Sequence, residues 1–189
     1  MEYVRWNKDI KPPSRNATCI WIYIDAPGFD RSRLSLPDGF RLSRDDHEIQ
    51  VLWIDDDKEV VDSECYPLSI ESIDVIAEKY NILSGKWMVF RPSQTIDDTW
   101  EVIAKSVSEG RLGVSAKVAS TLNKTVTGKE DYLICVYTED YRDEADVTRV
   151  REVLRELGIS ERIYYKPDIY TYLRIYSGKS RIQATKYHG

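Results

Sequence analysis

The side chains best suited to chemistry in this sequence are lysines and arginines interleaved with tyrosines near the end of the chain. Residues 162–187 hold six of the 13 tyrosines and six cations, with Asp168 as the one acid among them. This segment has a net charge of +5, whereas the whole chain has −5, so the positive charge is local. A local cationic surface on an acidic protein favours a specific phosphate-bearing ligand over a general polyanion. The composition leaves open whether that ligand is only bound or also cleaved.

Lys117 is an unusual cation outside that segment. It lies in the string EGRLGVSAKVAS, among small and β-branched residues, where a long cation has no packing role. It either faces solvent or points into a cleft, where burial would lower its pKa and suit it to act as a base or a phosphate contact. We expect folding to gather it with other cations and with tyrosines that contact the group attached to the phosphate. The predicted ligand-binding residues are Lys86, Lys117, Lys129, Tyr137, Tyr172, Arg174 and Arg181, with Lys117 as the candidate catalytic residue.

Other chemistries are disfavoured by the residues present. Cys19, Cys65 and Cys135 are widely spaced and form no CxxC pair, which argues against a disulfide framework and a zinc site. His47 lies in a charged loop and His188 is next to last, so neither is a strong general acid or metal ligand. No HExxH, P-loop or GxGxxG motif occurs. We therefore expect no cofactor and no metal.

Size and hydropathy favour a cytoplasmic globular protein. A chain of 189 residues with 42% apolar residues is typical of one domain with a full core. No apolar run approaches the ~18 residues of a membrane span, and the start, MEYVRWNKDIKPP, lacks the hydrophobic region of a signal peptide. The expected partner is a phosphorylated small molecule, an RNA end or a phosphopeptide, with no membrane partner. The sequence does not indicate an oligomeric state.

Hydrophobic periodicity predicts the elements that must position these side chains. Apolar residues at helical spacing predict helices over residues 69–85, 95–110 and 143–157. Apolar and β-branched runs predict strands over residues 18–24, 49–54, 86–91, 115–120, 132–138, 162–166, 170–176 and 181–187. Residues 25–48, rich in proline, glycine and charge, read as a long loop or loose hairpin, which is a common location for function.

The strand expected over residues 170–176 has two interpretations. Strand alternation places Tyr172 and Arg174 on one face together with Tyr170 and Tyr176. Such a face can stack an aromatic ligand while the guanidinium binds a phosphate. Alternatively, the tyrosines pack under a helix and Arg174 extends to water.

The order of these elements indicates the fold class. We expect an N-terminal arm, residues 1–16, followed by a single α+β domain, residues 17–189. Its sheet should be curved and mostly antiparallel, with about three helices on one face.

Four strings carry a resemblance to a known family. SGKW at 84–87, EGRLGVSAKVAS at 109–120, LICVYTEDYRDEADVTRV at 133–150 and YKPDIYTYL at 165–173 resemble, in that order, the uncharacterised family typified by the basophilic leukaemia-expressed protein. The fold of that family is similar to that of the cap-binding translation initiation factor 4E, which implies the α+β arrangement above. The initiation factor holds a methylated base between two tryptophans, and the matching positions here contain none. Cap binding in that manner is therefore not expected.

A weaker similarity connects the chain to bacterial phosphothreonine lyases. The order of the lyase site residues corresponds here to Lys86, Lys117 as the base, Lys124 or Lys129, Tyr137, Arg174 and Arg181. Met88 occupies the position of the lyase general acid, and a thioether cannot donate a proton. Binding of a phosphate-bearing ligand is thus the leading expectation. The alternatives are a lyase-like elimination with Lys117 as base and a protein-interaction domain without a phosphate site.

Overall fold

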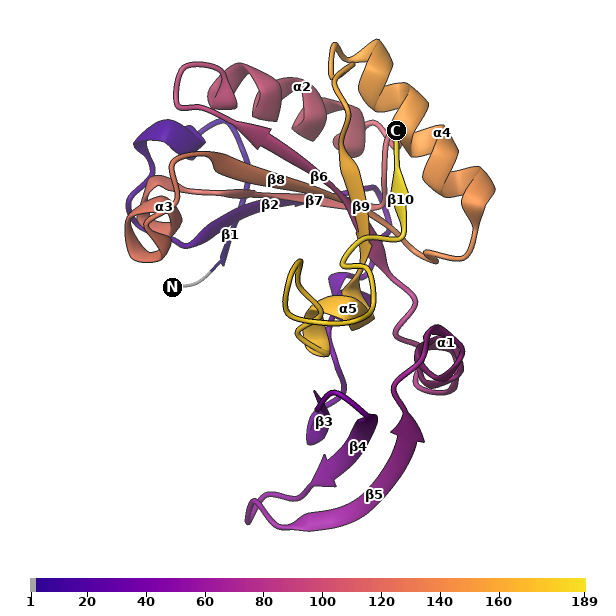
Figure 1. Ribbon diagram of the computed structural model, residues 1–189. Coiled ribbons are helices and arrows are strands. Elements are labelled where there is room, and N and C mark those ends of the chain that lie inside the picture. Colours follow the sequence, from indigo (N-terminus) through magenta and orange to yellow (C-terminus); the bar gives the residue numbers. More distant parts are fainter. Residues whose placement is uncertain (1–2) are drawn as a thin grey trace.

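The computed structural model describes residues 3–189, which form two β-sheets and five α-helices (Figure 1). Within these residues the larger sheet has seven strands. In spatial order they are β1 (Tyr3–Arg5), β2 (Trp21–Asp25), β7 (Ser115–Ala119), β8 (Tyr132–Thr138), β6 (Gly85–Arg91), β9 (Tyr164–Pro167) and β10 (Tyr187–His188). Neighbouring strands are antiparallel except β1 and β2, which run parallel. The prediction of an α+β fold with a mostly antiparallel sheet is confirmed.

Two helices, α2 (Ile96–Ser108) and α4 (Glu144–Glu156), cover one face of the large sheet (Figure 1). The stripe of α2 that faces the sheet buries Trp100, Ile103 and Val107. From the sheet side, Trp87 Nε1 donates a hydrogen bond to the carbonyl oxygen of Val147 in α4 at 3.0 Å. We call the opposite face of this sheet the open face. It carries Trp21, Tyr23, Lys86, Met88, Ser115, Lys117, Cys135 and Tyr137, which alternate along the same strands with residues of the apolar core.

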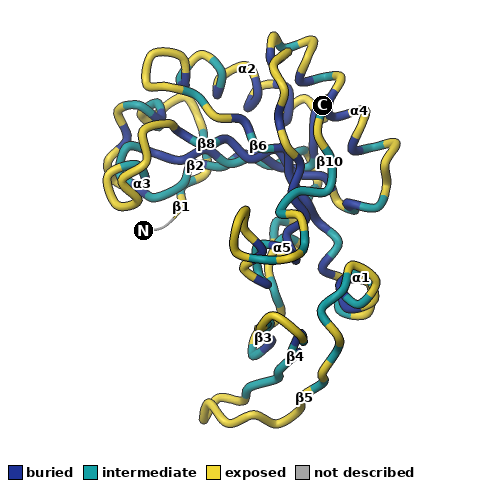
Figure 2. Tube along the Cα trace, viewed as in Figure 1, coloured by how far each residue is buried: buried dark blue, intermediate teal, exposed yellow. Residues whose placement is uncertain are grey.

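A second sheet projects from the body of the molecule (Figure 1). It consists of β3 (Phe40–Arg44), β4 (Glu48–Ile54) and β5 (Val60–Pro67). Figure 2 shows that β5 is largely exposed, in contrast to the central strands of the large sheet. Helix α1 (Ile70–Lys79) follows, and the ring of its C-terminal neighbour Tyr80 lies 4.8 Å from that of Phe40. One of the three predicted helices therefore packs on the small sheet.

The chain after β9 differs from the prediction. Residues Asp168–Tyr172 form a short helix, α5, so the expected strand over 170–176 is wrong. The backbone N–H of Asp168 donates to the carbonyl oxygen of Ser84 at 2.8 Å, which directs the chain away from the sheet. Arg174 then adopts a left-handed conformation, with φ 53°. The strand expected over 181–187 is also wrong, since pairing resumes only at Tyr187 in β10.

Other elements go beyond the prediction. Helix α3 (Thr121–Thr127) is capped by Ser120, whose hydroxyl accepts from the N–H of Asn123 at 3.2 Å. Short 3₁₀ helices occur at η1 (Pro13–Arg15) and η2 (Arg31–Leu34). Within the segment predicted as an arm, β1 pairs with the edge of the large sheet. None of the helices in residues 3–189 is long and apolar enough to span a bilayer.

Candidate functional site

The open face gathers basic and aromatic side chains from neighbouring strands. Lys86 on β6 lies opposite Tyr137 on β8, and Tyr137 lies opposite Ser115 on β7. Two residues after Ser115, Lys117 lies opposite Tyr23 on β2. Because side chains on a strand alternate, all these residues point to the same side of the sheet.

A cavity of about 680 Å³ lies against this face. Its walls come from strands β1, β2, β6, β7 and β8, from the η2 segment and from helix α5. The lining includes three cations, Arg31, Lys86 and Lys117, and four tyrosines, Tyr3, Tyr23, Tyr137 and Tyr172. Four of the seven predicted ligand-binding residues therefore meet in one place: Lys86, Lys117, Tyr137 and Tyr172.

Lys86 is held by neighbouring polar groups. Its ammonium forms an ion pair with Asp168 and donates to the hydroxyl of Thr171 at 3.1 Å. The hydroxyl of Ser84 donates to the second carboxylate oxygen of Asp168 at 2.6 Å. Burial disfavours the charged lysine, but the Asp168 carboxylate outweighs this effect and raises the pKa of Lys86. Lys86 thus remains charged, and Asp168 already neutralises it.

Lys117 has no such partner. Its ammonium lies 4.5 Å from the ring centre of Trp21 and 5.8 Å from those of Tyr3 and Tyr137. No hydrogen bond or ion pair connects it to another side chain in residues 3–189. Burial lowers the pKa of Lys117. Trp21, which comes from β2, contributes a ring to the open face beside this lysine.

Arg31 lines the cavity and was not among the ligand-binding residues predicted from the sequence. Its Nη1 donates to Asp25 at 3.0 Å and to the hydroxyl of Ser115 at 2.8 Å, and the guanidinium lies 4.1 Å from the ring centre of Tyr23. Nε and Nη2 have no hydrogen-bond acceptor within the described chain. The available signal was its place in the 25–48 loop, where Arg31 and Arg33 flank Ser32 next to the Asp30 cap.

The cavity retains an excess of positive charge. Arg31, Lys86 and Lys117 are opposed by two carboxylates, Asp25 and Asp168, each bound to one of the first two cations. The remaining charge is the ammonium of Lys117. A site with this balance can accept an anion.

Two of the cavity tyrosines, Tyr137 and Tyr172, differ in their hydroxyl contacts. Tyr172 donates to the carbonyl oxygen of Leu34 at 3.0 Å, which connects α5 to the η2 segment. The hydroxyl of Tyr137 has no hydrogen-bond partner among residues 3–189. Burial raises the pKa of Tyr137 well above its ordinary value, so its phenol stays protonated.

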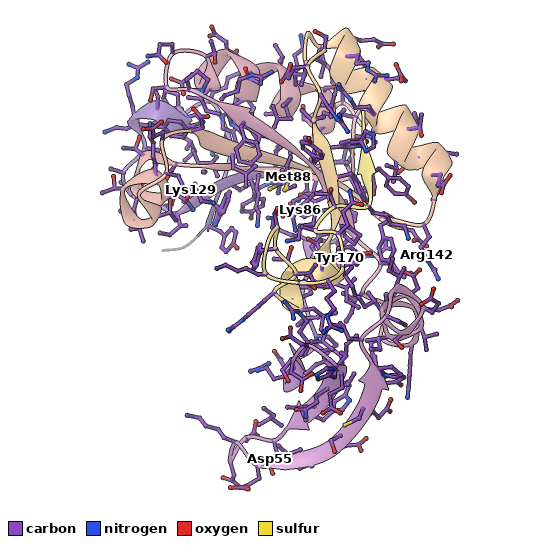
Figure 3. The ribbon with its side chains drawn as sticks, viewed as in Figure 1. Asp55, Lys86, Met88, Lys129, Arg142 and Tyr170 are labelled. Atoms are coloured by element: carbon purple, nitrogen blue, oxygen red, sulfur yellow. The ribbon has the colours of Figure 1, made fainter. Side chains whose placement is uncertain are left out.

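The other predicted cations lie elsewhere. Arg174 lines a second cavity of about 520 Å³ with Arg44 and Lys179, and this cavity shares Tyr172 with the first. Lys129 and Arg181 are exposed and line neither of these two cavities. Figure 3 shows Lys86 beside Met88, whereas Lys129 lies well apart from both, next to α3.

Lys166 adds a buried lysine close to the second cavity. Its ammonium donates to the carbonyl oxygen of Ile175 at 2.7 Å and lies 4.0 Å from the ring centre of Tyr176. Burial, helped by the nearby charge of Lys86, lowers the pKa of Lys166 to about 8. Among the described residues, no group of histidine, cysteine and acidic side chains is placed to hold a metal ion.

Comparison with known proteins identifies the family. Residues 63–174 match the family described as Basophilic leukemia-expressed protein Bles03, and this match spans more than half of the chain. The protein belongs to the Bles03 family. The prediction made from the four sequence strings is thereby confirmed. The matched region contains β6, β7, β8 and α5, which supply Lys86, Lys117, Tyr137 and Asp168 to the cavity.

Solved structures of the initiation factor eIF4E are similar to this Bles03 chain at low identity. A schistosome eIF4E complexed with m7GpppA and 4E-BP has a TM-score of 0.40 and 14% identity, covering 81% of this chain and 100% of the other. Ascaris suum eIF4E-3 with an m2,2,7G cap has a TM-score of 0.41 and 16% identity, covering 91% and 96%. C. elegans eIF4E-3 with Mextli and a cap analog has a TM-score of 0.39 and 17% identity, covering 76% and 98%. These likenesses concern the path of the chain and not its ligands.

Proposed function

We propose that this protein binds a phosphate-bearing ligand in the cavity of the open face, with Lys117 and Arg31 as its anion contacts. The observation that supports this proposal most strongly is the ammonium of Lys117, which borders the cavity without a counter-ion. A buried charge without a polar partner is unfavourable, and a bound anion would supply that partner. The expected cytoplasmic location belongs to the same proposal.

Arg31 is suited to hold the phosphate in a fixed orientation. Asp25 and Ser115 bind one end of its guanidinium, which leaves Nε and Nη2 as a fork of donors. Such a fork matches the oxygens of a phosphate, and charge-assisted hydrogen bonds of this kind are strong. Since Asp25 already orients the arginine, little side-chain entropy would be lost on binding.

The remaining predicted residues fit an extended ligand. A cavity of about 680 Å³ lies in the range of small-molecule sites and can hold a nucleotide or the phosphorylated end of an RNA or peptide. Tyr137 and Tyr172 would contact the group attached to the phosphate. Arg174, in the adjoining second cavity, would receive a second anionic group, while Lys129 and Arg181 would meet only the outer parts of a longer ligand.

The proposal is tested by isothermal titration calorimetry with 5′-AMP and with a phosphothreonine peptide at low salt. Lys117→Met keeps the length of the side chain and removes its charge. Loss of one charge-assisted hydrogen bond, about 1.5–3 kcal/mol, should weaken binding by roughly 10- to 150-fold. Lys105→Met, which removes an exposed lysine of α2 outside both cavities, is the matched control and should bind normally. Equal affinities of wild type and Lys117→Met would eliminate the site.

A second candidate function is a lyase-like elimination. It is favoured by the lowered pKa of Lys117, because a neutral amine can abstract a carbon-bound proton β to a phosphate ester. Met88 offers no proton for the leaving group, so the phenol of Tyr137 would have to supply it. Incubation with a phosphothreonine peptide should then release phosphoric acid, detected by mass spectrometry. Recovery of intact peptide would exclude this chemistry.

A further inference from the structure

We propose that Lys117 condenses with a carbonyl group of the bound ligand to form an imine, so that the ligand class of this cavity is a short phosphorylated aldehyde or ketone. This inference rests on the proposed function, because the same cavity must hold the phosphate. It adds a covalent step and a substrate class to a binding site.

Lys117 differs from the other cations of the cavity in its freedom to react. Lys86 is occupied by Asp168 and Thr171, and the guanidinium of Arg31 keeps its proton at any ordinary pH. Lys117 has neither a hydrogen-bond acceptor nor an ion-paired carboxylate in the described chain, and Asp168 acts on it only through its charge, without an ion pair. Its lowered pKa reduces the cost of forming the neutral amine, which is the nucleophilic form.

The rings around Lys117 suit both the reactant and the product. Trp21, Tyr3 and Tyr137 lie within 5.8 Å of the ammonium, and aromatic faces attract a cation. A protonated imine is also a cation on the same nitrogen, so the same rings would stabilise it. A carboxylate at this place would instead favour the unreactive ammonium. The aromatic rings therefore stabilise the protonated imine as well as the ammonium, so they do not disfavour the product of the condensation.

The condensation balances without any co-reactant. The lone pair of Nζ attacks the carbonyl carbon, a C–N bond forms, and the carbonyl oxygen takes a proton to give a carbinolamine. The C–O bond then breaks, and the oxygen leaves as water with the two hydrogens that the neutral amine carried. The imine nitrogen takes back the proton that the ammonium had released, which gives the protonated imine. Nothing is oxidised or reduced. The phenol of Tyr137 is protonated and has no hydrogen-bond partner within residues 3–189. It can donate a proton to the carbonyl oxygen and accept one from the nitrogen.

The spacing of the two anchors limits the length of the ligand. Arg31 donates to the hydroxyl of Ser115, which is two residues before Lys117 on the same strand and the same face. Two residues of a strand span about 7 Å. A phosphate bound at Arg31 and a carbonyl at Lys117 would therefore be separated by only a few bonds, as in a three-carbon aldehyde phosphate.

Reductive trapping tests this inference on the full chain. The protein is incubated at neutral pH with glyceraldehyde 3-phosphate and sodium cyanoborohydride, and labelling of each lysine is measured by peptide mass spectrometry. We expect Lys117 to be labelled severalfold faster than the exposed Lys129. Glyceraldehyde without phosphate should label Lys117 much more slowly. Labelling of Lys117 no faster than Lys129, or equally fast without the phosphate, would overturn the inference.

Two variants separate this chemistry from simple binding. Tyr137→Phe removes the hydroxyl and keeps the ring, so it should slow labelling of Lys117 by a larger factor than it weakens 5′-AMP binding, whereas Arg31→Lys should weaken both. If wild type binds 5′-AMP through Lys117 yet shows no preferential labelling, the imine is wrong and the proposed binding function stands. If 5′-AMP binds equally to wild type and Lys117→Met and labelling is also absent, both proposals fail.

Discussion

The two faces of the seven-stranded sheet differ in how completely their side chains are partnered. Under α2 and α4, Trp87, Val118 and Ile134 are at most 2% exposed and pack in one apolar core. On the open face, Lys86 has a carboxylate partner, whereas Lys117, two strands away, has only aromatic rings. Alternation along the same strands produces both faces. The covered face therefore stabilises the fold, and the open face keeps an unsatisfied charge that a ligand can use.

The largest expected effect is the loss of stability when the ion pair between Lys86 and Asp168 on the open face is broken. Asp168→Ala leaves Lys86 buried without a counter-ion, which should lower the free energy of unfolding by roughly 3–5 kcal/mol. Replacing Lys86 as well, in Lys86→Met with Asp168→Ala, should recover most of that loss. Urea unfolding of the two single variants and the double variant gives the coupling free energy. Additive effects of the two substitutions would show that the pair is not coupled.

Substitutions on the neighbouring strands β8 and β7 compare how much each face of the sheet contributes to stability. Ile134→Ala, on the covered face of β8, should destabilise the protein by roughly 2–5 kcal/mol through loss of burial and a new cavity. Lys117→Met, on the open face of β7, should change stability by less than about 1 kcal/mol and affect mainly ligand binding. Thermal and urea unfolding measure both. A comparable loss of stability in Lys117→Met would mean that Lys117 supports the fold.

Lys166 gives a pH-dependent prediction of intermediate size. Its pKa of about 8 in the folded protein lies below the value of about 10.4 for an unfolded lysine, so between these values the unfolded chain binds more protons. Stability should therefore rise with pH across this window, by roughly 1–3 kcal/mol relative to Lys166→Met. Unfolding at several pH values between 7.5 and about 10 tests this. A flat difference between the two proteins would contradict the lowered pKa.

The smallest expected effect concerns the second cavity. Arg174→Ala should change the affinity for 5′-AMP by less than about threefold, because Arg174 lines the neighbouring cavity and not the first. A ligand with a second anionic group should respond more strongly. Calorimetry with 5′-AMP and with adenosine 3′,5′-bisphosphate distinguishes the two cases. A large loss for 5′-AMP would place Arg174 in the primary site.

Strand alternation explains which parts of the candidate site are predictable from sequence. Lys86, Lys117 and Tyr137 lie on regular strands, so their common face follows from a period of two residues once the strands are placed. Arg31 and Asp168 come from a 3₁₀ turn and from the start of a short helix, whose positions depend on contacts across the fold. Local sequence carries little information on such contacts.

The errors in the fold have a similar cause. The string YTYLRIY has the β-branched and aromatic composition of a strand, but hydrogen bonds of Asp168 with Ser84 and the left-handed Arg174 override that preference. Strand β5 escapes prediction because it is exposed along most of its length and lacks apolar alternation. The helices α2 and α4 have clear apolar stripes, and Asp143 caps α4, so both helices lie where the sequence places them.

The most direct test of the account measures the ionisation of Lys117 itself. NMR of protein with isotope-labelled lysines can follow the titration of Lys117 with and without 5′-AMP, and the Lys117→Met variant assigns its signal. The groups whose charges act on Lys117 are Cys135, Lys86, Asp168 and Arg31. The account predicts a pKa below the ordinary lysine value in the free protein, and a higher pKa once the phosphate supplies a counter-ion. A pKa that does not change on addition of saturating 5′-AMP would contradict the central claim that Lys117 is the unpaired cation of an anion site.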